Sequence, residues 1–268
     1  MSNYQGVLTN ITMGADPEVF VGYSDGTYSS AIGKIGGSKD NPKPVKQGAI
    51  QEDNVLAEFN IDPASSKQEF IGNINMVFSE LEKALEVHKL HALIKTSHTY
   101  DQAQLDGWGH KALEFGCGAE WDVYTQQVKS KPNGSLSGLR TAGGHIHVGY
   151  DDPFEPGNYS LGKMMDFVLG LPSVLMDKDT DRRSLYGQAG AIRHKPYGVE
   201  YRTLSNFWLA SDELKSWVYE KTMWSTQNLS MLQSFLDEVG EKTLQKVINN
   251  SDIKSAKAIC SHLGLEAA

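Results

Sequence analysis

The segment Arg140-Thr-Ala-Gly-Gly-His-Ile-His-Val-Gly149 places two imidazoles two residues apart in a run of small and β-branched residues. Side chains at positions i and i+2 of a strand lie on the same face of a sheet. His145 and His147 would therefore share one face, and Ile146 and Val148 the other. The pattern predicts a strand with one face for chemistry and one face in the core.

The same spacing of polar residues recurs three more times along the chain. The pairs are Asp16 with Glu18, Glu58 with Asn60, and Glu200 with Arg202. Neighbouring residues such as Val19, Phe59 and Tyr201 suit the opposite, buried face of a sheet. One such pair alone would be typical of the solvated face of an antiparallel sheet, but four pairs with acids, imidazoles and an arginine favour a functional surface.

The remaining patterns predict helices that cover the apolar face of the sheet. Ser66 and Glu69 form a capping-box sequence that begins a long amphipathic helix ending near residue 90. A second helix is expected from Tyr159 to Lys178, interrupted near Pro172. We expect one domain over residues 1–268, with the sheet core at about 11–208 and a helical C-terminal layer at 209–268.

Composition excludes several classes of function. The 268 residues are 40% hydrophobic and 22% charged, which is typical of a globular protein. A net charge of -8 argues against a general nucleic-acid or anionic-membrane surface. The chain shows no signal peptide or membrane span, and Cys117 and Cys260 have no metal-binding or disulfide spacing, so we expect a cytoplasmic protein in which Cys117 is structural.

Carboxylates combined with a few imidazoles suit a hard divalent cation, Mg2+ or Mn2+, better than zinc, which draws more often on cysteine and histidine. Basic residues occur in two further places. Lys34 lies in the glycine-rich segment Gly33–Lys39, which could approach phosphate but lacks the spacing of a P-loop. Arg182, Arg183 and Arg193 precede the Glu200 strand and suit phosphate or carboxylate oxygens, with salt bridges to nearby aspartates as the alternative.

In their order along the chain, these motifs resemble the carboxylate-amine ligases of the glutamine synthetase and glutamate-cysteine ligase superfamily. The resemblance is greatest to the phage-associated amidoligases of type 2, the phiEco32-like group, and it extends over roughly residues 12–208. It implies an α+β fold in which a curved, glutamine synthetase-like antiparallel sheet surrounds a tunnel and is backed by helices. ATP would enter the tunnel from one end and the second substrate from the other. It also implies a reaction in which a carboxylate attacks the γ-phosphate of ATP and an amine then attacks the acyl phosphate to form an amide.

The resemblance also implies roles for individual residues. Asp16, Glu18, Glu58 and Glu200, with His145 or His147, would hold two or three Mg2+ ions. Arg202, Arg183 and Arg193 would balance charge on the transferred phosphoryl group, and Lys34 and Arg182 would join them in binding ATP. Phosphoryl transfer relies mainly on such positioning and charge neutralisation.

Several points stay open at this stage. The general base is not identified, and carboxylates near Asp53 or in the turn Glu120–Asp122 are candidates. The acyl donor and the amine acceptor could be amino acids, polyamines or peptides, and a homo-oligomer and a phage origin are open too.

Three other functions remain as alternatives. The first is an ATP-dependent phosphotransferase of the same fold, which forms no amide. The second is a metal-dependent hydrolase built on His145 and His147, against which the lack of further histidine or cysteine ligands counts. The third is a non-enzymatic nucleotide-binding protein, against which the full set of acids and arginines counts.

Overall fold

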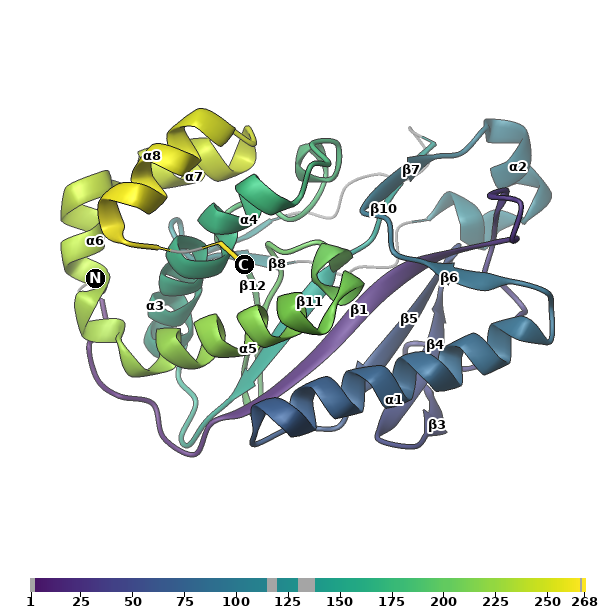
Figure 1. Cartoon of the computed structure of the whole chain (residues 1–268), viewed down its shortest axis with the longest axis horizontal. Helices are drawn as coiled ribbons and strands as arrows, with labels where there is room; N and C mark the ends of the chain where they lie inside the picture. The colour runs from purple at the N-terminus through teal and green to yellow at the C-terminus, as the bar shows by residue number, and fades with distance from the viewer. Residues whose placement is uncertain (1–2, 115–119, 130–137, 266) are drawn as a thin grey trace.

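The computed structural model describes residues 3–114, 120–129, 138–265 and 267–268, so Cys117 lies outside the described residues. Within them, an antiparallel sheet of 11 strands runs in the order β3-β4-β5-β1-β11-β13-β12-β8-β9, with β2 and β6 also paired to β1. The path ends at β3 and β9 and does not close, and β7 and β10 form a separate pair (Figure 1). The α+β fold with a large antiparallel sheet and helices, expected from the sequence, is confirmed.

The strands have the following bounds: β1 Thr12–Gly22, β2 Tyr28–Ser29, β3 Lys43–Val45, β4 Gly48–Asp53, β5 Leu56–Ile61, β6 His91–Leu93, β7 Ser97–Thr99, β8 Glu120–Asp122, β9 Gln127–Lys129, β10 Leu139–Thr141, β11 Gly144–Gly149, β12 Ala191–Lys195 and β13 Gly198–Tyr201.

Strand β1 is the central element because its partners change along its length. It pairs with β11 over residues 12–17, with β5 at residues 18–19, and with β6 over residues 20–22. Figure 1 shows it crossing the molecule diagonally between the two halves of the sheet. Met13, Ala15 and Val19 point to the buried core, so Asp16 and Glu18 face the other side.

Two long helices, α1 (Lys67–Glu86) and α5 (Asp212–Gln227), lie side by side along one face of the sheet (Figure 1). The Ser66 hydroxyl accepts from the Glu69 N–H at 3.2 Å, and the Glu69 carboxylate accepts from the Ser65 N–H at 2.8 Å. Apolar residues of α1, from Phe70 to Leu85, join the main hydrophobic core. Covering the apolar face with helices leaves the polar face of the sheet for chemistry.

The second expected helix is broken by a change of helix type rather than by a simple stop. Helix α3 (Glu155–Met165) passes into a π-helical turn (Asp166–Gly170) and then into α4 (Leu171–Met176). Pro172 lies in the first turn of α4, where its missing N–H costs least. The interruption therefore precedes the proline instead of occurring at it.

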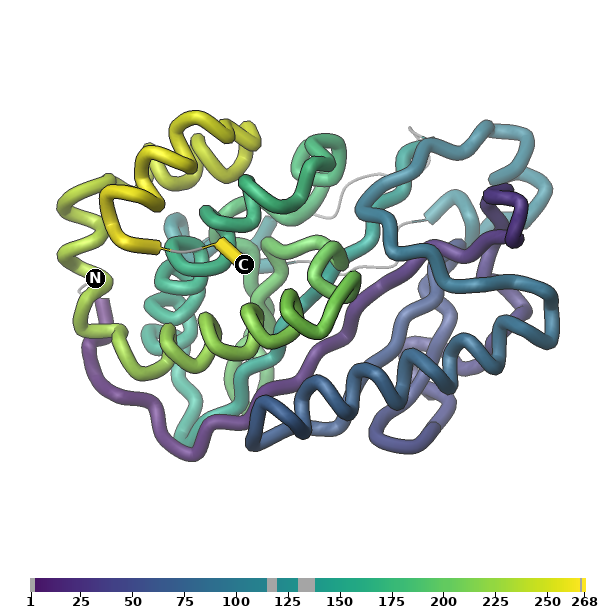
Figure 2. The backbone as a smooth tube through the Cα atoms, in the orientation of Figure 1, coloured from purple at the N-terminus to yellow at the C-terminus, as the bar shows by residue number. Residues whose placement is uncertain are grey.

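The C-terminal residues form a helical layer, as predicted. It contains α5, α6 (Leu232–Val239), α7 (Glu241–Asn249) and α8 (Ile253–Leu263); α2 (Gln102–Gly107) and the short helices at residues 110–113, 182–184, 206–210 and 229–231 complete the helical elements. Both described chain ends lie on this helical side (Figure 2), with Asn3 bonded to Gln233 and Ala268 to Met176. None of the described helices is long and apolar enough to cross a membrane.

Candidate active site

Cross-strand register brings the four polar pairs onto one surface. Asp16 lies directly opposite His145, His147 lies opposite Glu200, and Glu18 lies opposite Glu58. Directly opposite residues on neighbouring strands project to the same face. The strands β5, β1, β11 and β13 therefore present acids, imidazoles and an arginine side by side.

Asp16, His147 and Glu200 form a cluster that could hold a metal ion, since one ligand atom of each lies within 4.8 Å of the others. The distance between His147 Nε2 and Asp16 Oδ1 is 3.0 Å. Both atoms are buried, yet neither makes a hydrogen bond of good geometry with a described residue. Buried polar atoms normally have partners. Two carboxylates and one imidazole that point at a common space fit a divalent cation such as Mg2+ or Mn2+.

The charges within this cluster are strongly coupled. Burial would raise the pKa of Asp16, but His147 and His145 outweigh it and hold that pKa well below its usual range. Burial lowers the pKa of His147, but Asp16 outweighs it and the net pKa is raised. Burial and the Arg202 charge lower the pKa of His145. Asp16 is therefore an anion, and His145 favours its neutral form.

Glu200 is fully buried and surrounded by cations. Its carboxylate pairs with Arg202, with Arg193 at 3.1 Å and with Lys195 at 2.8 Å. Burial opposes ionisation of Glu200, but Arg202 leads the opposing charges and lowers its pKa to about 2. The carboxylate is thus ionised, and two of its cationic partners, Arg193 and Lys195, also line the cavity described below.

Glu18 and Glu58 lie on the other side of Asp16 in a more acidic environment. Glu18 accepts from the Gly143 N–H at 2.7 Å, and Glu58 accepts from the Gln51 side chain at 2.8 Å. Burial raises the pKa of Glu18, and burial together with the neighbouring carboxylates raises the pKa of Glu58 well above its usual range. Two buried acids with raised pKa values are typical of a place where a positive charge is to be received.

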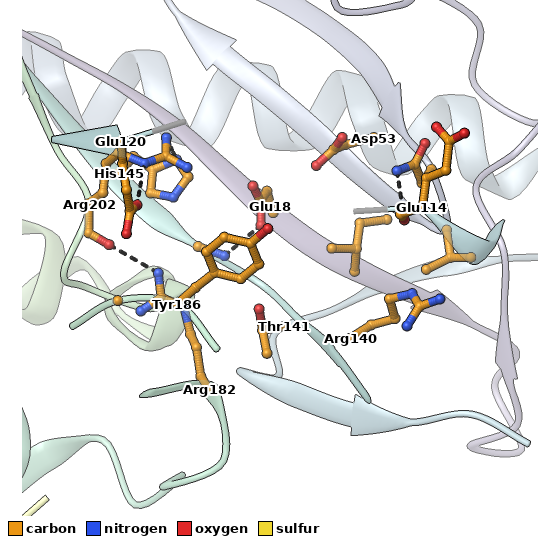
Figure 3. Close-up of a pocket in the computed structure, with 15 residues that line it drawn as sticks. Glu18, Asp53, Glu114, Glu120, Arg140, Thr141, His145, Arg182, Tyr186 and Arg202 are labelled. Atoms are coloured by element: carbon orange, nitrogen blue, oxygen red, sulfur yellow. Dashed lines mark hydrogen bonds and ion pairs between the residues drawn. The ribbon is translucent and has the colours of Figure 1, made fainter. Parts of the chain in front are cut away.

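Two cavities meet at this surface. The larger has a volume of about 470 Å3, and its walls include Asp16, His147 and the basic residues Lys39, Arg193 and Lys195. The narrower has a volume of about 30 Å3 and is shown in Figure 3. Glu18, His145 and Arg202 line both. A group bound in one cavity would therefore meet a group bound in the other at these three side chains.

The narrower cavity is lined by acids and guanidinium groups from distant parts of the chain. Figure 3 shows Glu120 beside His145 and Arg202, Asp53 beyond Glu18, and Arg140, Arg182 and Tyr186 around the rest. Arg202 Nε lies 3.2 Å from Glu120 Oε2, which ties β13 to β8. At about 30 Å3 the space admits about two water-sized groups, so only the reacting ends of substrates would enter it.

The structure does not bring every predicted residue to these cavities. Among the described residues, Lys34, Arg183 and Glu200 line neither of the two, although Glu200 pairs with Arg193, Lys195 and Arg202, which line the larger one. Arg183 is buried and donates to the Ser173 and Ser251 hydroxyls at 2.9 Å and 3.0 Å, behind the sheet. Its neighbour Arg182 lines the narrower cavity and donates to the Thr203 carbonyl at 2.8 Å.

Several residues at the site had no role in the sequence-based prediction. Lys195, Tyr197 and Arg140 line the cavities, and Lys39 rather than Lys34 reaches the larger one from the glycine-rich segment. Lys195 could have been found from its alternation with Arg193 on one strand. Tyr197 and Arg140 reach the site through the β12–β13 loop and the β7–β10 pair, which periodicity does not predict.

Comparisons with known proteins agree with the resemblance seen in the motifs. The family model of the phage phiEco32-like COOH-NH2 ligases of type 2 matches residues 128–247. This segment contains His145, His147, Arg193, Glu200 and Arg202. The resemblance to that family is confirmed, although Asp16, Glu18 and Glu58 lie outside the matched segment.

A search of curated proteins finds no match. Among solved structures, "Apo GmaS without ligand" is 12% identical with a TM-score of 0.37, covering 96% of this chain and 70% of that chain. "GmaS/ADP complex-Conformation 1" is 11% identical with a TM-score of 0.35, covering 96% of this chain and 71% of that chain.

Proposed function

We propose that the protein is an ATP-dependent carboxylate-amine ligase that forms an amide through an acyl-phosphate intermediate, with residues 1–268 acting as one ligase domain in the cytoplasm. The observation that carries the proposal is the meeting of two cavities at Glu18, His145 and Arg202, beside a cluster suited to a cation. A ligase of this kind has to bring ATP and a carboxylate together at one point. The match to a family of COOH-NH2 ligases supports the same conclusion.

The larger cavity would hold the nucleotide. Lys39, Arg193 and Lys195 supply positive charge along its walls, as a polyphosphate requires. Asp16, His147 and Glu200 would hold Mg2+ or Mn2+, with Glu18 and Glu58 available for a further ion. The ion would supply charge neutralisation of phosphate oxygens and screening between ATP and the anionic carboxylate. When phosphate enters, Arg193 and Lys195 can exchange their pairing with Glu200 for contacts to it.

Arg202 would act at the boundary between the two cavities. Its guanidinium contacts Glu200, Glu120 and His145, so its fork is held in one orientation. A guanidinium fixed in this way can donate to the equatorial oxygens of a phosphoryl group without rearranging during transfer. We assign to Arg202 the stabilisation of the transferred phosphoryl group.

The narrower cavity would admit the reacting ends of the acyl donor and the amine. Arg182 and Arg140 would attract the carboxylate, and Asp53 and Glu120 would attract the ammonium form of the amine. Both acids line this cavity, and Glu120 contacts Arg202 at the shared boundary, so either would accept a proton from the amine as it attacks. Their roles as general base remain part of this proposal.

The test is turnover of Mg-ATP with pools of amino acids, polyamines and short peptides. The expected result is substrate-dependent release of ADP and phosphate, together with a product whose mass equals that of two substrates less one water. Glu200→Gln keeps the shape of the side chain and removes its charge, so it should lose both signals. Glu213→Gln should keep them, because Glu213 is exposed in the first turn of α5.

Other outcomes would identify another function. Transfer of phosphate to an acceptor without amide formation would indicate a phosphotransferase, and turnover without ATP would indicate a hydrolase on His145 and His147. Nucleotide binding with no turnover under any pool would contradict an enzymatic role.

A further inference from the structure

Tyr197 makes a contact with the candidate cation cluster that the proposed chemistry does not yet use. Its hydroxyl lies 2.5 Å from His147 Nδ1, and the two rings stack with centroids 5.9 Å apart and an angle of 20° between their planes. Tyr197 is 44% exposed, so its ring faces solvent on one side while its hydroxyl points inward.

The two nitrogens of His147 therefore face different partners. Nδ1 meets the Tyr197 hydroxyl, and Nε2 meets Asp16 Oδ1 at 3.0 Å. A neutral imidazole carries one N–H, and the nitrogen without it is the one that can bind a metal. If Nδ1 donates its hydrogen to Tyr197, Nε2 presents its lone pair to Asp16 and Glu200.

The backbone holds Tyr197 in this position. Lys195 pairs with Gly198, so the loop between β12 and β13 consists of Pro196 and Tyr197 alone. The Tyr150 N–H donates to the Tyr197 carbonyl at 3.0 Å, which ties the loop to the end of β11. Gly198 has a φ of +149°, and a Cβ there would lie 2.1 Å from the Val148 carbonyl oxygen, so the close approach requires glycine.

We propose that Tyr197 is a positioning residue that holds His147 in the tautomer protonated on Nδ1 and so presents Nε2 as a ligand for a divalent cation in the Asp16–His147–Glu200 cluster. The inference rests on the proposed function, because it takes that cluster to be a cation site. Residues that orient a metal-binding histidine in this way typically change metal affinity by 10- to 100-fold when they are removed.

The experiment compares Tyr197→Phe with wild type and with Tyr23→Phe. Tyr23 is similarly exposed at 42% and lies in the turn after β1, away from the cluster, so it is the matched control. Mn2+ affinity is measured by the paramagnetic resonance signal of free Mn2+, and the tautomer of His147 by nitrogen-proton correlation of its ring. Neither readout depends on ligase activity.

Tyr197→Phe should bind Mn2+ about 10-fold more weakly and should lose the preference for the Nδ1–H tautomer, while Tyr23→Phe should match wild type in both. A thermal unfolding midpoint near that of wild type would separate this effect from a loss of folding. A lowered midpoint with Mn2+ affinity and tautomer unchanged would mean that Tyr197 is merely structural and would overturn the proposal.

Asp16→Asn separates the inference that the cluster binds a cation from the inference that Tyr197 orients His147. If it abolishes Mn2+ binding and Tyr197→Phe binds as tightly as wild type, the cation site stands and the role of Tyr197 is overturned. If wild type binds no Mn2+, or Asp16→Asn binds as tightly as wild type, the cluster is not a cation site and both inferences are overturned.

Discussion

At the scale of single residues, the site depends on how one guanidinium connects three strands. Arg202 on the end of β13 contacts Glu200 beside it, Glu120 on β8 and His145 on β11. These contacts use both Nε and Nη1, which are separate donors in a planar fork. A lysine ammonium has the same charge but cannot reproduce that geometry.

Arg202→Lys is therefore expected to lower the turnover of the ligase by at least about 100-fold, the typical cost of losing one oriented donor to a developing charge. Arg193→Lys is the matched control, because Arg193 contacts Glu200 through Nη1 alone and a lysine can make that contact. The measurement is the rate of ADP release with saturating substrates. Equal rates for the two variants would mean that the fork of Arg202 has no special role.

The sequence did not distinguish between Arg182 and Arg183. The family resemblance implies that both bind ATP, and both precede the Glu200 strand. They lie in a short helical turn, where adjacent side chains point in different directions, so Arg182 reaches the narrower cavity and Arg183 reaches Ser173 behind the sheet. Composition and spacing contain no information on which of two adjacent arginines faces inward.

At the scale of elements, the π-helical turn connects the helical layer to the strand that carries the site. It places the Asp166 carboxylate against the hydroxyls of Tyr201 at 2.7 Å, Tyr124 at 2.8 Å and Thr203 at 3.2 Å. Tyr201 and Thr203 flank Arg202 and point to the opposite face. Asp166 therefore supports β13 from behind, and π-helical turns are often found at such functional positions.

This arrangement predicts a pH dependence of stability. Burial raises the pKa of Asp166 to about 6, from an ordinary value of 3.8. Between these values the folded protein keeps a proton that the unfolded chain has lost, so the contribution of Asp166 to the free energy of unfolding falls as pH rises and levels off above about pH 6. The difference between the two pKa values corresponds to a loss of about 3 kcal/mol in the free energy of unfolding.

Asp166→Asn keeps an acceptor for the hydroxyls and does not titrate, so it isolates the effect. The free energy of unfolding of wild type minus that of the variant should fall between about pH 4.5 and about pH 6.5. Urea unfolding at a series of pH values measures it, and a difference that stays flat or rises would contradict the assignment.

The close packing of the π-helical turn gives a second prediction. A Cβ at Gly170 would lie 2.7 Å from the Tyr201 hydroxyl and 3.2 Å from Asp166 Oδ1, whereas a Cβ at Gly72 in α1 would meet nothing within 4 Å. Gly170→Ala should therefore lower the free energy of unfolding by about 1–3 kcal/mol, and Gly72→Ala should raise it by up to about 1 kcal/mol. Denaturant unfolding of both variants measures the contrast, which a similar change in both would contradict.

The elements differ in how well their sequence predicts them. Strand β11 was predicted because its polar and apolar residues alternate. Helix α1 was predicted because its apolar residues recur at helical spacing after a cap at Ser66. The π-helical turn was not predicted, because residues 167–170 contain no polar side chain that would mark a helical face, and only the interruption near Pro172 was evident. The contact between Glu120 and Arg202 depends on pairing of β8 with β12, a long-range register that no local pattern specifies.

At the scale of the whole molecule, the fold divides the two faces of one sheet between stability and chemistry. Helices α1 and α5 cover one face (Figure 1). The polar pairs and the two cavities lie on the other face. Strand β1 contributes Glu18 to the boundary between the cavities and Asp16 to the larger cavity, because it pairs with both halves of the sheet. The alternation on four strands was sufficient to predict this surface, but not its division into two cavities.

The acyl-phosphate mechanism predicts that the oxygen lost from the substrate carboxylate is transferred to phosphate. Once the pools have identified the acyl donor, that donor labelled with 18O in its carboxylate is incubated with Mg-ATP and the amine, and the released phosphate is analysed by mass spectrometry. A ligase that activates the carboxylate as an acyl phosphate should transfer one label to phosphate for each amide formed. Amide formation with unlabelled phosphate, or label in AMP instead, would contradict the acyl-phosphate mechanism.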